Sequence, residues 1–282
     1  MAQRMRRPAY AAVLALLLAF AVIPFWWMGV TSVKPDKELY SIENPLFPAN
    51  PTFEHYIYLF ESTDLLIWLR NSLIVSAVAA LLAVSLALPA GYAISRYRTT
   101  HTKLFGLSLM LGYGFMPILL VLPMFALAVK TGLYNSLSVL CLVYPSFLIP
   151  VAAWLMAGYF AEVPVSVEHA AQLDGCGVVR TILYSAIPCA RNGLVATFVF
   201  CFLLSWGEYV YALGLTSSSR MRTLPVGLAT LESGDVYAWG SIMGAALLST
   251  VPVLLLLIIA RRRLAHGLSI GVIKRDGSNR QT

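Results

Sequence analysis

Four neighbouring residues in one apolar stretch of this 282-residue sequence could bind a polar solute. The stretch SWGEYVYALGL contains Trp206, Glu208, Tyr209 and Tyr211. An aromatic ring offers a flat face on which a sugar can stack, and a carboxylate accepts hydrogen bonds from hydroxyl groups. A charge inside an apolar segment costs about 3 kcal/mol unless it faces protein or a water-filled cavity. The four residues are therefore candidate contacts of a sugar-like solute.

Two other interpretations of Glu208 compete with solute contact. In the first, the acid lies near the outer end of a helix, where it is paired or hydrated. The sequence supports this interpretation and solute contact equally. A proton relay is the weaker third interpretation, because the other apolar segments contain no His, Lys, Arg or Asp as its partner.

The residue arrangements that catalyse reactions are missing from the sequence. The four histidines fall in loops or at the ends of apolar segments, and they are His55, His101, His169 and His266. No HExxH zinc motif, Walker A motif or pair of acids inside the apolar segments is present, and the four cysteines form no CxxC pair. We therefore expect no catalytic residue, no metal site and no bound cofactor. Energy for any driven process must come from another chain.

A polar, glycine-containing stretch, EHAAQLDGCGVVRTILYSAIP, begins at Glu168 and ends at Pro188. Pro164 suits the start of a helix, and apolar residues recur after it at helical spacing. Asp174, Gly175 and Gly177 then break the helix, and a second short helix is expected over 178–187. Periodicity alone fits equally an interfacial helix and a surface that docks another protein. The small side chains of this stretch favour docking, because they let another backbone approach closely.

The elements that position these residues are membrane-spanning helices. Apolar residues make up 59% of the sequence and charged residues 12%, which leaves too little polar surface for a water-soluble globule. About 20 apolar residues cross a bilayer as a helix. Six runs meet this length, at 9–30, 71–95, 104–129, 136–160, 188–213 and 240–260. The sequence thus predicts an all-α integral membrane protein with one domain over 1–282 and a loop at 161–187.

The basic residues indicate the orientation of these spans. With six crossings, 14 of the 20 Lys and Arg residues fall on the same face as both termini. The positive-inside rule assigns this face to the cytoplasm. The net charge of +7 therefore reflects topology, and we expect membrane lipid and not nucleic acid as its partner.

The spacing of the polar stretch resembles the loop signature EAA-x3-G-x9-I-x-L-P of permeases in binding-protein-dependent ATP-binding cassette importers. His169-Ala170-Ala171, Gly175 and Pro188 keep that spacing, with His169 at the position of the glutamate and Glu168 one residue earlier. Further strings are similar to this family over nearly the whole chain, namely PTFEHY, NSLIVS, GYAISRYR, RTLPVGLA and HGLSIGVIK. Together they resemble the second permease of the carbohydrate-uptake branch. SWGEY stands where that branch commonly has WNE.

The resemblance implies a type I importer permease of six spans, with a coupling helix between spans 4 and 5. Residues 161–187 are called the coupling loop below. By resemblance, the ATPase-docking residues are Glu168, His169, Ala170, Ala171, Asp174, Gly175 and Pro188. The loop should be helical and braced against the ends of the third and fourth spans, because it has to transmit motion.

The resemblance also implies the partners and the location. A second, different permease completes the pathway, an ATPase dimer carries ATP and Mg, and an extracytoplasmic binding protein delivers a sugar-like solute. The expected location is the inner membrane of a bacterium or archaeon, with both termini cytoplasmic. Two alternatives are kept. An ion-coupled secondary transporter would need internal repeats and intramembrane charges, and a membrane scaffold would not need a spaced docking loop.

Overall fold

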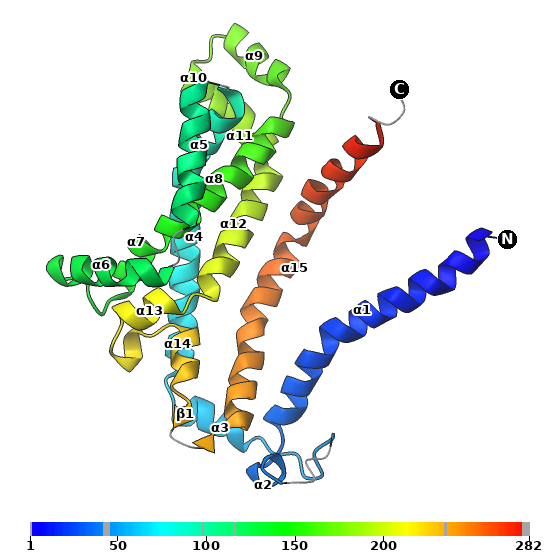
Figure 1. Ribbon diagram of the computed structural model, residues 1–282, viewed down its shortest axis with the longest axis vertical. Helices are drawn as coiled ribbons and strands as arrows, with labels where there is room; N and C mark the ends of the chain where they lie inside the picture. Colours follow the sequence, from blue (N-terminus) through cyan, green and yellow to red (C-terminus); the bar gives the residue numbers. More distant parts are fainter. Residues whose placement is uncertain (1, 42–45, 98, 115–116, 234–235, 278–282) are drawn as a thin grey trace. The chain divides into compact units, whose positions relative to one another are not determined.

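The computed structural model describes residues 2–41, 46–97, 99–114, 117–233 and 236–277, and this part of the chain is almost entirely helical (Figure 1). Arg98, in the GYAISRYR string, lies outside the described residues. Contacts divide the chain into two compact units, which are described separately. The first unit comprises 1–69 and 226–251, and the second comprises 70–225 and 252–282.

The helices and strands follow in chain order. The elements before the coupling loop are α1 (Ala2–Ser32), α2 (Asp36–Leu39), α3 (Glu54–Glu61), α4 (Leu65–Arg96), α5 (Thr100–Tyr113), α6 (Pro117–Lys130), α7 (Leu137–Val143) and α8 (Pro145–Glu162). The loop contains α9 (Val165–Leu173), α10 (Val178–Thr181), a π-helical turn (Ile182–Ala186) and the start of α11 (Ile187–Cys189). The remaining elements are α12 (Arg191–Trp206), α13 (Val210–Leu215), a 3-10 turn (Ser219–Met221), α14 (Leu224–Ala229), β1 (Glu232–Ser233), β2 (Val236–Tyr237) and α15 (Trp239–Gly277).

Four helical segments of the described chain are long and apolar enough to cross a membrane. They are Ala11–Ser32, Leu65–Arg96, Leu137–Glu162 and Trp239–Arg263. Two bent helix pairs raise the number of candidate spans to six if each pair counts as one span. The chain is therefore an all-helical membrane protein with four to six candidate spans.

The two bent pairs overlap the candidate spans at 104–129 and 188–213, and each breaks the apolar run into two helices. The helices of the first pair, Thr100–Tyr113 and Ile118–Lys130, meet at 91°. Val178–Cys189 and Arg191–Trp206 meet at 79°, and the helix breaks again between Trp206 and Val210. Proline and glycine explain the first break, since Gly114 caps α5 and Pro117 starts α6. Apolar composition predicts a span but does not report such turns.

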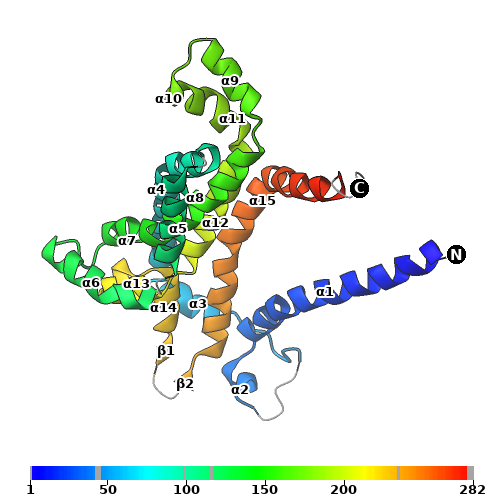
Figure 2. The same ribbon diagram turned by 45° about the horizontal axis from the view of Figure 1, so that its top comes forward.

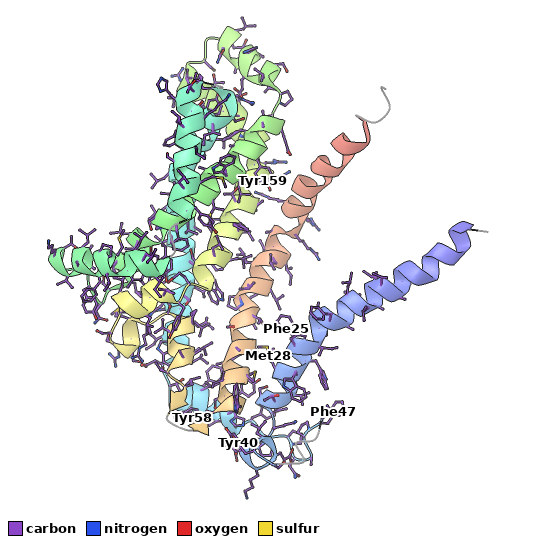
Figure 3. All side chains as sticks on the ribbon, in the orientation of Figure 1. Phe25, Met28, Tyr40, Phe47, Tyr58 and Tyr159 are labelled. Carbon is purple, nitrogen blue, oxygen red and sulfur yellow. The ribbon has the colours of Figure 1, made fainter. Side chains whose placement is uncertain are left out.

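The first unit holds buried polar residues beside α3. One ring nitrogen of His55 lies 2.8 Å from the Lys34 carbonyl oxygen, and the Tyr56 and Ser32 hydroxyls are 2.8 Å apart. Aromatic side chains gather near the end of α1, where the rings of Trp26 and Phe47 pack edge to face at 5.5 Å. Figure 3 labels Phe25, Met28, Tyr40, Phe47 and Tyr58 in this unit. These contacts join α1, the following segment and α3 locally.

The second unit has its core where α4, α8 and the coupling loop meet. The buried residues of this cluster are Tyr92, Met156, Phe160, Val163, Ala186 and Ala190. The α8 and α12 helices approach each other closely at Gly193, which has no side chain. A Cβ atom at this position would overlap the ring of Tyr159, labelled in Figure 3. The coupling loop is thus attached to a packed core and not to one helix end alone.

Candidate functional site

The coupling loop folds as a helix, a turn and a second helical segment at one end of the second unit (Figure 2). Pro164 is extended, with φ −60° and ψ 130°, and α9 starts immediately after it. Gly175 ends the turn in the left-handed region at φ +87°, where a residue with a side chain is strained. The Cys176 amide donates to the Ala171 carbonyl at 3.0 Å, which closes the turn. The helical form predicted for the loop is present.

The side of α9 that packs inward is not the apolar side. Among the residues of α9, all of which the structure describes, only Glu168 is buried, with 4% of its surface exposed. Val167 and Leu173, two of the apolar residues in this helix, are 38% and 88% exposed. The apolar side chains of α9 therefore do not form its inward contact, which is made by an acid.

Glu168 is held inside the second unit by two residues of α4. The Tyr92 hydroxyl donates to Glu168 Oε2 at 2.8 Å. Arg96 donates to Oε1 from Nε at 2.9 Å and from Nη2 at 2.5 Å. Arg96 Nη2 also donates to the Val163 carbonyl at 2.9 Å. Both carboxylate oxygens are thus occupied by partners within the chain.

The other residues assigned to docking lie on or near the open surface. His169, Ala170, Asp174, Gly175 and Pro188 are exposed, and Ala171 is half-buried. Large apolar side chains beside them are also open, namely Leu173, Val178, Val179, Leu183 and Tyr184. Their docking role stays a prediction. Sequence reasoning missed the brace from Tyr92 and Arg96, although both lie in the GYAISRYR string that carried the family resemblance.

The brace differs in one respect from the prediction. The end of the fourth span, α8, contributes Val163 and Phe160 as expected. The other side of the brace comes from the end of the second span, α4, whereas the prediction named the third. A basic residue at the end of a span indicates topology by sequence alone, and only the packed structure shows that Arg96 pairs with Glu168.

The candidate solute contacts lie at the break between α12 and α13. Glu208 Oε1 accepts a hydrogen bond from the Tyr211 amide at 2.8 Å, and Oε2 accepts one from the Ala212 amide at 3.2 Å. The first amides of a helix have no carbonyl partner within the helix, so the Glu208 side chain caps α13. The Glu208 residue as a whole is half-buried.

The three aromatic residues of this group have different surroundings. Tyr211 is 1% exposed and stacks on Phe147, with ring centroids 6.0 Å apart. Trp206 is 9% exposed and stacks on Phe202 at 5.6 Å. Tyr209 is 37% exposed, so its ring is the one of the three that the isolated chain leaves open.

The loop after α13 is held by two asparagines far away in the sequence. Asn135, at φ +59°, accepts hydrogen bonds at 3.0 Å from the Ser217 and Ser218 amides. Asn71 donates from Nδ2 to the carbonyls of Arg220 and Arg222 at 2.9 Å. Asn71 belongs to the NSLIVS string, whereas nothing in the sequence marks Asn135 for this contact.

The fold and these sites define a class: a polytopic α-helical membrane protein with a structured loop at one end of its helices. Within the described residues, no group of three or more His, Cys, Asp or Glu side chains could hold a metal ion. Residues 83–269 match the family model described as "Binding-protein-dependent transport system inner membrane component". The chain belongs to this family.

The sequence is similar to individual permeases over nearly the full length of the chain. It is 35% identical over 263 residues to the inner membrane ABC transporter permease protein YcjP of Escherichia coli (strain K12), covering 93% of this chain and 94% of that one. It is 30% identical to the trehalose/maltose transport system permease protein MalG of Thermococcus litoralis, covering 92% and 94%. A crystal structure of a bacterial ABC transporter that imports alginate has the same fold, with a TM-score of 0.75, 19% identity and coverage of 94% and 98%.

Family membership confirms several predictions. The chain is a multi-pass inner membrane protein and a non-catalytic permease subunit, and no cofactor is expected on it. Its partners are those of an importer of this family: ATPase subunits, a binding protein and a second permease. The secondary-transporter and scaffold alternatives are set aside by this assignment.

Proposed function

We propose that this chain and a different second permease together form the pathway through which an ATP-driven importer takes up a sugar or sugar-like solute. The observation that carries the proposal is the coupling loop, whose helix, left-handed turn at Gly175 and second helical segment coincide with the family spacing. The trehalose/maltose permease MalG, 30% identical over most of both chains, supports the sugar class.

In this proposal the coupling loop faces the cytoplasm, and both termini lie on the same side. Basic residues gather on that side, as the positive-inside rule requires. A dimer of ATPase subunits binds ATP and Mg there, and its closure draws the two docked loops together. The helices of the two permeases then move as rigid groups and reorient the solute cavity.

The open surface of the coupling loop supplies the docking contacts. Leu173 is 88% exposed, and the neighbouring Ala170 and Gly175 are small enough to let a partner surface approach. Several exposed apolar side chains of one loop, here Leu173, Val178 and Val179, are typical of a protein-binding surface. We assign this contact to the ATPase.

The solute contact belongs to the break between α12 and α13 in this proposal. Tyr209 presents an open ring for stacking, and Glu208, which caps α13, is half-buried as a whole residue. Trp206 and Tyr211 support this surface from within, through their stacking on Phe202 and Phe147. All four residues therefore remain candidates for the pathway, with Tyr209 as the direct contact.

Purification of the tagged chain in mild detergent tests the proposed function. We expect a second permease and an ATPase subunit to copurify, and ATP hydrolysis to rise when an extracytoplasmic binding protein and its sugar are added. The copurified proteins are identified by mass spectrometry. Recovery of a stable chain alone, with no ATPase bound, would contradict the proposal.

A further inference from the structure

One acid of the coupling loop points away from the surface on which a partner would dock. Glu168 is 4% exposed, whereas its neighbour His169 is exposed. Successive residues of an α-helix differ by about 100° in direction, so the two side chains cannot serve the same surface. The role of Glu168 therefore differs from that of the residues around it.

The residues that bond Glu168 are themselves buried or nearly buried inside the second unit. The Arg96 and Glu168 side chains are 12% and 5% exposed, and their closest atoms are 2.5 Å apart. The Tyr92 hydroxyl occupies the second carboxylate oxygen at 2.8 Å. A buried carboxylate that loses such partners keeps its charge without compensation, which is costly. The arrangement holds α9 in one orientation on α4.

The same side chains reach two further parts of the fold. Arg96 donates to the Val163 carbonyl at the end of α8, so it joins α4, α8 and α9. The ring of Tyr92 packs edge to face on Phe160 of α8 at 5.5 Å. The second helical segment of the loop also contacts α9, because the Ser185 hydroxyl donates to the Val167 carbonyl at 3.3 Å. The coupling loop is therefore connected to the ends of α4 and α8 by polar and apolar contacts together.

We infer that Glu168 and Arg96 are positioning residues, which lock α9 to the cytoplasmic end of α4 so that a displacement of the docked loop moves α4 with it. Glu168 then acts through Arg96 and makes no direct contact with the ATPase. The inference rests on the proposed function for the direction of the motion, but the lock itself is a property of this chain. Tyr92 strengthens the lock by fixing the second carboxylate oxygen.

A double-mutant cycle in the assembled complex tests the lock. The variants are Glu168→Gln, Arg96→Gln and the two combined, with Glu162→Gln as the control, because Glu162 is an exposed acid at the end of α8. Two quantities are measured: hydrogen exchange of the α9 amides, and basal ATP hydrolysis by the copurified complex without solute. Coupled residues give a combined effect smaller than the product of the single effects.

We expect each single variant to speed exchange of the α9 amides about tenfold and to lower ATP hydrolysis to a similar degree. The combined variant should be no worse than the more severe single variant, and Glu162→Gln should match the unaltered chain. Tyr92→Phe keeps the ion pair and should speed exchange only about threefold. Arg96→Lys should fall between Arg96→Gln and the unaltered chain, because lysine keeps the charge but not the two nitrogens that share Oε1.

Two results would overturn the inference. If Glu168→Gln lowered ATP hydrolysis while Arg96→Gln did not, Glu168 would contact the ATPase directly. If both variants left α9 exchange unchanged, no lock would exist. Exchange can also be measured on the full chain without partners, so failure to copurify an ATPase would count against the proposed function and leave the lock to be judged separately.

Discussion

Two polar interruptions of the helical chain, the coupling loop and the break between α12 and α13, hold the acids Glu168 and Glu208 in different ways. Glu168 in the coupling loop is bonded by Tyr92 and Arg96, which lie 76 and 72 residues away. Glu208, between α12 and α13, is bonded by backbone amides three and four residues later. The first acid joins separate helices, whereas the second shapes its own chain segment. In this chain, the acid with distant partners braces helices against one another, and the acid with neighbouring partners caps a helix.

The largest effect should come from reversing a charge in the brace. Arg96→Glu would place two carboxylates together in a buried site, and we expect the free energy of unfolding to fall by about 3–5 kcal/mol. Thermal unfolding of the purified complex measures the change. Glu162→Arg, a reversal at an exposed position, is the control and should alter stability by less than about 0.5 kcal/mol. Equal melting temperatures of the two variants would show that the buried pair does not stabilise the loop.

A substitution in the turn of the coupling loop should separate docking from folding. Gly175→Arg puts a long charged side chain at φ +87°, and we expect uptake to fall more than about tenfold while membrane insertion persists. ATP hydrolysis should continue without coupled transport. Gly132→Arg is the matched control, since Gly132 has φ +70° and open space like Gly175 but lies between α6 and α7. Normal uptake by Gly175→Arg would refute the docking assignment.

The stability that the Glu208 cap provides should depend on its acceptor oxygens more than on its charge. Glu208→Ala removes both acceptors of the α13 amides, and we expect a loss of about 1–2 kcal/mol in stability. Glu208→Gln keeps one acceptor oxygen but turns a donor nitrogen toward the other backbone amide, so it should lose less stability than Glu208→Ala. If Glu208 also binds solute, Glu208→Gln should weaken uptake about fivefold with little change in stimulated ATP hydrolysis. Unchanged uptake in this variant would leave capping as its whole role.

The smallest effect is expected at Asn135. This half-buried residue contacts a loop about 80 residues later in the sequence. Asn135→Gly keeps the backbone at φ +59° without strain but removes the oxygen that accepts from Ser217 and Ser218. We expect a loss of about 1 kcal/mol in stability and faster amide exchange over 216–218. Asn135→Asp retains the acceptor and serves as the control. Identical exchange in both variants would mean that the side chain does not hold this loop.

Much of the helical pattern could be predicted because its causes are local. Runs of about 20 apolar residues predict spans, and Asp174-Gly175 after a helical pattern predicts a turn. The coupling loop was therefore found from the sequence, with its helix start after Pro164 and its turn at Gly175. Gly114 and Pro117 mark the position of the break between α5 and α6, but its 91° angle could not be predicted, because neither residue nor the apolar composition sets the direction of the second helix.

The sequence by itself determined the membrane class, the helical segments, the spaced coupling loop and the family. The tertiary structure decided which side of each segment faces inward: Glu168 turns toward Arg96, and Tyr211 packs on Phe147. The physical reason is the range of the interactions. Hydrophobicity and backbone preference act within a few residues, whereas an ion pair or a ring contact exists only after helices far apart in the sequence have packed together.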